Sequence, residues 1–169
     1  ILRRIGLLSD THSYLDPTLK SFFEDCDEIW HAGDIGDMKV MQELEKWKVI
    51  KAVHGNIDSG DVKRLYPEYQ IIEVEKRKFL LIHIAGRMGQ YNKNVIDILK
   101  SNSDIHCIIC GHSHILKVQN DSKFNILYMN PGAAGKHGFH LIKTALKFEV
   151  ESNQIKNLQV IELGKRAKI

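Results

Sequence analysis

The order of apolar segments constrains the fold of this chain more than any other feature of its sequence. Over the first two thirds of its 169 residues, short strand-like apolar runs alternate with helix-like segments. After Gly111 the pattern changes, and only strand-like runs follow. Alternating strands and helices form a mixed sheet, whereas consecutive strands form an antiparallel one. We therefore expect two sheets packed face to face, with helices outside, in a single domain over residues 1–169.

Local signals place the individual elements. Asp16 and Pro17 suit the N-cap and first position of a helix, and Asp37 suits the N-cap of a second helix. A third helix is expected over residues 91–100, where apolar residues share one face. Strands are expected near residues 5–8, 28–30, 49–53, 70–74, 79–82, 105–110, 117–119 and 124–129, with a hairpin turn at 120–122. Two later strands are expected to alternate, with inward side chains at Leu146, Phe148, Val150, Leu158 and Val160.

Composition and charge argue against several function classes. The chain is 43% apolar and 27% charged, which is typical of a folded globular protein rather than a disordered one. Its net charge is +3, and its two basic runs, 76–78 and 165–168, are short and separate. Nucleic-acid binding would call for a concentrated basic stripe or a known base-reading motif. No apolar stretch approaches the ~18 residues of a membrane helix, and residues 1–4 do not have the length of a signal peptide, so we expect neither feature.

The three cysteines are too few for a disulfide framework. Their low number indicates a reducing compartment, so we expect a cytoplasmic protein. Cys107 and Cys110 have the spacing of a metal-binding or redox pair, but no second pair completes a zinc site. Because both lie in the apolar run 105–110, we interpret them as part of a buried strand.

Side chains with metal-binding atoms occur where the predicted strands end. These residues are Asp10, His12, Asp34, Asn56, His83, His112 and His114. In open α/β sheets the ligand crevice forms outside the carboxyl ends of the strands, so we expect these side chains to meet at one edge. Gly33, Gly55 and Gly111 precede three of them, and glycine permits tight turns with positive φ.

The composition of this set indicates two metal ions. Two carboxylates, one amide and four imidazoles exceed the needs of one divalent ion and suit two ions about 3.5–4 Å apart. The mixed N and O donors fit Mn, Fe, Co, Ni or Zn and do not choose among them. We expect Mn, with Ni, Fe, Co or Zn as alternatives. The positive excess would attract a phosphate group. Two purely structural interpretations remain open, namely that Asn56 is an ordinary turn residue and that His83 is a core histidine.

Five motifs in this order resemble the calcineurin-like metallophosphoesterase family. They are Asp10-Thr11-His12, Gly33-Asp34, Gly55-Asn56, His83 and Gly111-His112-Ser113-His114. The run Asn130-Pro131-Gly132 also resembles the small bacterial and archaeal phosphodiesterase branch. The resemblance implies an α/β fold, a four-layer α/β/β/α sandwich of two mixed β-sheets flanked by helices. Dimers are common in that branch, so a homodimer is one expected state.

The resemblance also implies a role for each residue. It assigns Asp10, His12 and His114 to the first metal ion, Asn56, His83 and His112 to the second, and Asp34 to a bridge between them. Asp34, Asn56 and His83 are expected to take a direct part in catalysis. A bridging hydroxide would attack the phosphorus of a small phosphodiester in line with the leaving group.

One residue departs from the family pattern. Many members carry a histidine directly after the Gly-Asn pair. This histidine is thought to protonate the leaving group or to stabilise the transition state. In this chain the position is occupied by Ile57. A general acid contributes roughly 10²–10⁴-fold to a rate, so we expect a modest phosphodiesterase that prefers activated aryl diesters. The alternative is a metal-binding scaffold or protein-interaction module with little catalysis. The retromer sorting subunit, which resembles the same fold, is such a scaffold.

Other polar residues have more than one interpretation. Arg87 can reach a phosphate or lie in a solvated loop, and Lys136 and His137 follow a glycine-rich run and can line the pocket. The histidines outside the ligand set, His137 included, are expected to be structural or exposed; they are His31, His54, His106, His137 and His140.

Overall fold

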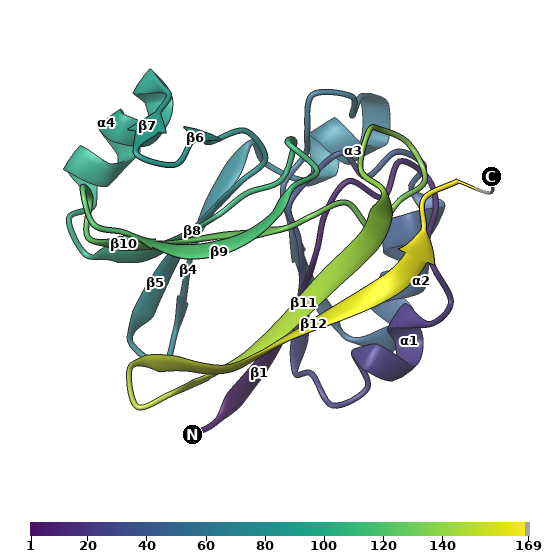
Figure 1. The fold of residues 1–169 in the computed structure, drawn as a ribbon, viewed down its shortest axis with the longest axis horizontal. Helices are drawn as coiled ribbons and strands as arrows, with labels where there is room; N and C mark the ends of the chain where they lie inside the picture. Colours follow the sequence, from purple (N-terminus) through teal and green to yellow (C-terminus); the bar gives the residue numbers. More distant parts are fainter. Residues whose placement is uncertain (168–169) are drawn as a thin grey trace.

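The computed structural model describes residues 1–167 and contains two five-stranded sheets that pack against each other (Figure 1). The first sheet contains β1 (Arg3–Leu8), β2 (Glu28–His31), β3 (Val49–Ala52), β11 (Ile142–Glu151) and β12 (Gln154–Lys165), in the order β12-β11-β1-β2-β3. Strands β1, β2 and β3 are parallel to one another, and β11 is antiparallel to both β1 and β12.

The second sheet contains β4 (Tyr69–Val74), β5 (Arg77–Ile82), β8 (Ile105–Ile109), β9 (Leu116–Asp121) and β10 (Ile126–Pro131), in the order β4-β5-β8-β10-β9. Its three central strands are parallel, and β4 and β9 are antiparallel edges. Both sheets are therefore mixed, as the family resemblance implies. The prediction of a purely antiparallel sheet from strand order is wrong, because β9 and β10 join one sheet and β11 and β12 join the other.

Helices cover the outer faces of both sheets. Helices α1 (Leu19–Phe22), α2 (Lys39–Trp47) and α3 (Gly60–Leu65) lie beside the first sheet, and their apolar residues form one buried cluster with it (Figure 1). Helix α4 (Lys93–Ser101) and the hairpin of β6 (Gly86–Arg87) and β7 (Gln90–Tyr91) cover the second sheet in the same way. The layers follow the expected α/β/β/α order. Among the described residues, no helix has both the length and the apolar character that crossing a membrane requires.

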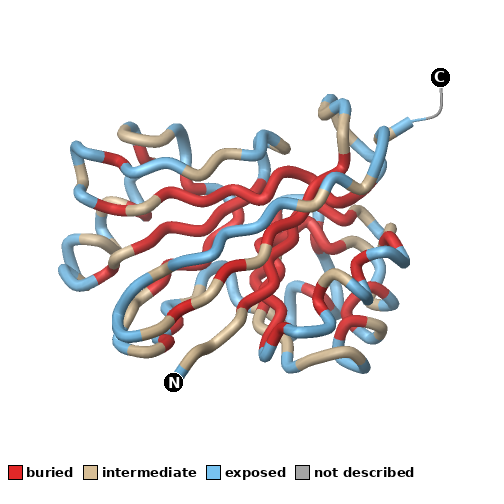
Figure 2. The backbone as a smooth tube through the Cα atoms, turned by 60° about the horizontal axis from the view of Figure 1, so that its bottom comes forward, coloured by how far each residue is buried: buried red, intermediate tan, exposed pale blue. Residues whose placement is uncertain are grey.

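The main core fills the space between the two sheets, where the central strands are buried (Figure 2). Trp30, Phe79 and Phe148 are fully buried there. The ring centroid of Trp30 lies 5.1 Å from that of Phe79 and 6.1 Å from that of Phe148, and the two Phe centroids are 5.8 Å apart. Aromatic pairs at such separations contribute about 0.5–1.5 kcal/mol each beyond area burial. This cluster holds the two sheets together and so fixes the edge where their strand ends meet.

The structure corrects the prediction for the last strand. Leu146 is buried as expected, whereas Leu158 and Val160 are 39% and 47% exposed. Val160 pairs directly with Leu146 and shares its face, because directly opposed residues of two strands point the same way. Strand β12 is the edge of its sheet, so this face is not covered there by the second sheet.

Two predicted element boundaries also differ from those in the structure. Asp16 Oδ1 accepts the backbone N–H of Thr18 at 2.9 Å, as a cap would, but the regular helix begins only at Leu19. The other carboxylate oxygen of Asp16 is held by Lys143 Nζ at 3.1 Å. The turn between β9 and β10 spans residues 122–125, with Asp121 accepting the N–H of Lys123 at 3.0 Å, so the second strand begins later than predicted.

Candidate metal centre

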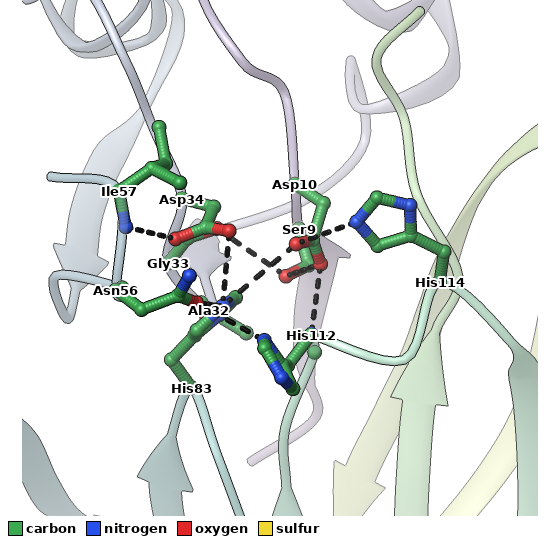
Figure 3. Close-up of polar contacts among 12 residues, drawn as sticks. Ser9, Asp10, Ala32, Gly33, Asp34, Asn56, Ile57, His83, His112 and His114 are labelled. Atoms are coloured by element: carbon green, nitrogen blue, oxygen red, sulfur yellow. Dashed lines mark hydrogen bonds and ion pairs between the residues drawn. The ribbon is translucent and has the colours of Figure 1, made fainter. Parts of the chain in front are cut away.

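The seven predicted ligand residues lie together where the parallel strands of both sheets end. All of them except His12 are labelled in Figure 3. They occupy the loops after β1, β2, β3, β5 and β8. Five of them have positive φ: Asp10 (54°), His12 (45°), Asp34 (56°), His112 (71°) and His114 (62°). Such conformations cost about 1–3 kcal/mol each in non-glycine residues and cluster at functional sites.

The glycines beside these residues act differently from the prediction. Gly33 does have a positive φ of 100°, but Gly55 and Gly111 do not. At Gly55 the missing side chain is what matters, because a Cβ there would lie 2.1 Å from Asp34 Oδ1. Gly55 is therefore needed for the close approach of Asp34 more than for backbone freedom.

The first group of ligand atoms comes from Asp10, His12 and His114, which lie within 4.8 Å of one another. Asp10 Oδ1 lies 3.2 Å from His114 Nε2 and 3.9 Å from His12 Nε2. The other oxygen of Asp10 accepts hydrogen bonds from Ser9 Oγ at 2.7 Å and from the His112 backbone N–H at 3.1 Å. The Asp10 carboxylate is therefore fixed with Oδ1 facing the two imidazoles.

The second group comes from Asp34, Asn56, His83 and His112. Asn56 Oδ1 lies 3.0 Å from both His83 Nε2 and His112 Nδ1. His83 Nδ1 lies 2.8 Å from the Ala32 carbonyl oxygen, which only accepts hydrogen bonds. His83 therefore donates from Nδ1, and its Nε2 faces the other members of the group. These contacts argue against the interpretations of Asn56 as a simple turn residue and His83 as a core histidine.

Asp34 lies between the two groups. Its Oδ2 is 3.4 Å from His12 Nε2 in the first group and 3.2 Å from His83 Nε2 in the second. Its Oδ1 accepts the backbone N–H of Ile57 at 3.1 Å. This orientation presents one oxygen of Asp34 to both groups of ligand atoms.

The donor set fits divalent cations. Asp10 Oδ1 and His12 Nε2 are buried and have no hydrogen-bond partner among the described residues. Buried polar atoms without partners are rare, and each calls for an explanation such as a bound ion. Two groups of N and O donors that include such atoms suit Mn, Fe, Co, Ni or Zn.

The electrostatics of the site keep both carboxylates ionised. Burial alone would raise the pKa of Asp10 and Asp34. The imidazoles of His114 and His83 outweigh burial at Asp10, and those of His12 and His83 do so at Asp34, so both pKa values are lowered. Burial opposes protonation of His83, but the two carboxylates raise its pKa. The centre therefore attracts positive charge, whether carried by protons or by metal ions.

Asp58 ties the two loops of the second group together, a role that sequence analysis missed. Its carboxylate accepts the backbone N–H groups of Ile35 at 3.1 Å, Gly36 at 2.9 Å and Gly55 at 2.8 Å. Two of these donors follow Asp34, and the third precedes Asn56. Asp58 thus positions both ligand residues without contacting either group of ligand atoms.

His31 is a structural residue beneath the site, as predicted. Its Nδ1 accepts the Gly33 backbone N–H at 3.1 Å, and its Nε2 lies 2.9 Å from Thr11 Oγ1. Thr11 Oγ1 donates its own hydrogen to the Ile35 carbonyl oxygen at 2.9 Å, so it accepts from His31. Burial lowers the pKa of His31 to about 4, and this neutral imidazole satisfies both neighbours.

We expect His31 to make the fold sensitive to acid. The pKa of His31 in the folded protein lies below its unfolded value of about 6.5. The neutral imidazole therefore contributes its full stabilisation of the fold above pH 6.5, and this stabilisation is lost as the pH falls towards 4. At pH 5 the loss is roughly 2 kcal/mol. Urea unfolding in EDTA at pH 7 and pH 5 should therefore show a larger loss of stability in the wild type than in His31→Gln. Equal losses would contradict this explanation.

His137 and His140, two histidines outside the predicted set, contact the first group. The His137 ring stacks on His12 with centroids 4.8 Å apart, so it lines the site, while Lys136 lies over the ring of Tyr14. His140 Nε2 lies 2.8 Å from the Gly135 carbonyl oxygen and must donate to it.

His140 also sets the protonation of a predicted ligand. Burial lowers its pKa, so the neutral ring presents the Nδ1 lone pair to His114 Nδ1 at 3.2 Å. His114 therefore donates from Nδ1, which orients its Nε2 towards Asp10 Oδ1, 3.2 Å away.

We expect His140→Ala to lower the affinity of the first group for Mn²⁺ by about 10–100-fold, as is typical when the hydrogen-bond partner of a ligand histidine is lost. Isothermal titration calorimetry measures this, with His106→Ala as a matched control distant from the loops of the site. The ¹⁵N shifts of His114 in the metal-free protein report its protonated nitrogen directly. A His114 proton on Nε2 in the wild type would contradict the assignment.

Comparison with known proteins places the chain among phosphoesterases. The model of the calcineurin-like phosphoesterase superfamily domain matches residues 4–153. A probable metallophosphoesterase of Methanocaldococcus jannaschii is 28% identical over 163 residues, which cover 94% of this chain and 81% of that protein. A probable metallophosphoesterase of Methanothermobacter thermautotrophicus is 28% identical over 140 residues, covering 76% of each.

Solved structures share the fold at lower identity. Vps29 of Chaetomium thermophilum has a TM-score of 0.74 at 14% identity, with 95% of each chain covered. A structure described as that of a novel archaeal phosphodiesterase has a TM-score of 0.71 at 22% identity, covering 94% of this chain and 99% of that one. The layer order and the sheet topology agree with this family, and the match over residues 4–153 shows that the chain belongs to the calcineurin-like phosphoesterase superfamily.

Proposed function

We propose that this protein hydrolyses phosphodiesters with two divalent metal ions held by the seven residues of the metal centre. The observation that carries the proposal is the position of Asp34 Oδ2, which lies 3.4 Å from one group of ligand atoms and 3.2 Å from the other. The family match supports phosphoester hydrolysis in general, and the archaeal phosphodiesterase of the same fold supports a diester substrate.

The residues of the chain hold and orient the reacting groups. When bound, two divalent ions lower the pKa of a nucleophilic water and neutralise charge on the phosphoryl oxygens. Ser9 and His112 N–H restrain one oxygen of Asp10 and leave the other for a metal ion. The Ala32 carbonyl similarly directs the free nitrogen of His83 towards Asn56 and Asp34.

Ile57 determines which leaving groups can depart readily at this site. Its backbone N–H is bound to Asp34, and its side chain is 45% exposed beside the centre. An alkyl side chain has no proton to give, so the departing oxygen receives no acid catalysis from this position. Activated aryl diesters, whose leaving groups need little protonation, are therefore the expected substrates in the assay.

The proposal is tested by assaying bis(4-nitrophenyl) phosphate and 4-nitrophenyl phosphate with metal-stripped protein, before and after addition of Mn²⁺. We expect diester hydrolysis that requires Mn²⁺ and exceeds monoester hydrolysis. Equal or better turnover of the monoester would overturn the diester assignment. No turnover with any divalent ion, despite two metals bound per chain, would favour the scaffold function instead.

Restoring the histidine that Ile57 replaces should extend activity to poorer leaving groups. A general acid contributes roughly 10²–10⁴-fold at its best, and an engineered one less, so we expect Ile57→His to raise alkyl diester hydrolysis by about tenfold or more. The increase for bis(4-nitrophenyl) phosphate should be smaller, because nitrophenolate leaves without a proton. Ile57→Gln, which is polar but not acidic, is the matched control. An equal gain in both variants would mean that polarity, not proton donation, is responsible.

A further inference from the structure

A cavity of about 380 Å³ adjoins the metal centre beside His112. We call it the Arg87 cavity; its main walls are Ile84, Arg87, Met88, His112, Ile115 and Lys117. It lies between the β6 hairpin and β9, and its volume is within the range of roughly 300–1,000 Å³ that small-molecule sites occupy.

The charge of this cavity is positive. Arg87 and Lys117 contribute two cations, and no carboxylate of the described residues lines the walls. Within residues 1–167, neither cation has a carboxylate within 4.0 Å. Ser113 Oγ, also in the wall, accepts hydrogen bonds from Asn130 Nδ2 at 3.0 Å and from the Ile115 N–H at 3.2 Å. The hydroxyl hydrogen of Ser113 is therefore free to be donated to an anion.

The walls between these polar groups are apolar. Ile84, Met88 and Ile115 line the cavity, and Ile115 is 64% exposed. Apolar and thioether surfaces of this kind pack well against a planar ring. The cavity thus combines a place for an aromatic group with donors for a second anion.

A second cavity of about 300 Å³ is lined by two other members of the second group, Asn56 and His83, and has a different character. We call it the Glu68 cavity; its walls include His54, Asn56, Glu68, His83, Asn92 and Asn94. Ile84 lines both cavities and separates them. Glu68 makes the second cavity unsuited to an anion, and Asn92 Oδ1 is buried without a hydrogen-bond partner among residues 1–167.

A phosphodiester has two arms, and the second group of metal ligands lies between two unlike cavities. We propose that the Arg87 cavity binds the arm of an asymmetric phosphodiester that carries a nucleoside with a second phosphate group, while the Glu68 cavity receives the neutral arm. The inference rests on the proposed function and specifies its substrate class. Hydrolysis consumes one water, breaks one ester P–O bond and leaves a phosphomonoester and an alcohol.

The experiment compares two dithymidine phosphodiesters that differ only in a terminal 5′-phosphate, pTpT and TpT, with Mn²⁺ and product analysis by liquid chromatography. We expect kcat/KM for pTpT to exceed that for TpT by at least about tenfold, through a lower KM, as charge-assisted bonds to Arg and Lys form. In the double variant Arg87→Ala/Lys117→Ala this ratio should fall to about one. The control, Lys76→Ala/Lys156→Ala, removes two positive charges from exposed hairpins and should keep the wild-type ratio.

The outcomes separate this inference from the proposed function. Hydrolysis of both compounds with a ratio near one would overturn the inference and leave the phosphodiesterase function standing. Absence of hydrolysis for both dinucleotides and for bis(4-nitrophenyl) phosphate would overturn the function, whereas hydrolysis of the aryl diester alone would mean only that the alkyl leaving groups of the dinucleotides depart too slowly beside Ile57. Calorimetric titration of the metal-free protein with pTpT and TpT then tests the cavity alone. Tighter binding of pTpT that the double variant loses supports the inference, and equal affinities overturn it.

Discussion

Replacing Asp34 with alanine is expected to reduce Mn²⁺-dependent diester hydrolysis by about 10³-fold, because metal ions supply several kcal/mol of transition-state stabilisation. Asp34 is the residue whose loss affects both groups of ligand atoms at once, since Oδ2 lies within 3.4 Å of His12 and 3.2 Å of His83. Metal content measured after dialysis should fall below that of the wild type in the same preparation.

Asp34→Asn separates the charge of Asp34 from its size. An amide oxygen can still accept the Ile57 N–H, so the loop should keep its shape, but the negative charge between the groups is gone. We expect activity close to that of Asp34→Ala and a circular dichroism spectrum close to that of the wild type. Asp97→Ala, which removes an exposed carboxylate from α4, is the control. Wild-type metal content and activity in Asp34→Ala would show that this residue is not a ligand.

Replacing Asp58 with alanine should produce the largest loss of stability among residues around the site. The change leaves three backbone N–H groups, those of Ile35, Gly36 and Gly55, without their acceptor. A hydrogen bond to a charged group contributes about 1.5–3 kcal/mol, and water will satisfy some of the donors, so we expect a loss of about 3 kcal/mol. For a chain of this size that corresponds to a fall in Tm of roughly 6–12 °C.

Asp61→Ala is the matched control for this prediction. Asp61 lies three positions further on, is exposed, and pairs with Arg64 one turn along α3. Exposed pairs of this kind contribute about 0–1 kcal/mol, so its replacement should barely change Tm. Asp58→Ala should also weaken Mn²⁺ binding, because the loops of Asp34 and Asn56 lose their common anchor. Equal Tm values for the two variants would contradict the anchoring role of Asp58.

The ligand residues could be predicted from sequence because their positions follow from strand geometry. Asp10, Asp34 and His83 each come within three residues of the end of an apolar strand, and parallel strands in one sheet end at the same edge. The residue types then indicated which class of metal ion the site suits, because imidazoles combined with carboxylates suit transition-metal ions. Neither step required knowledge of how the loops pack.

The residues that support these ligands could not be predicted in the same way. His140 contacts His114 across 26 positions of the chain, and Asp58 binds N–H groups 22 and 23 positions away. A hydrogen bond between two loops depends on where both loops lie, and no local pattern marks a histidine or an aspartate as its member. The same limit applies to the Arg87 cavity, whose walls come from separate loops and strands.

By itself, the sequence determined the apolar periodicity, the positions of the strand ends and the identity of the ligand atoms, because these depend on residue type and spacing. Only the tertiary structure decided how the late strands divide between the two sheets and which β12 side chains stay exposed. It also decided which loop residues position the ligands and where cavities remain beside them. The physical reason is that each of these properties depends on contacts between segments far apart in the chain, formed only when both sheets pack.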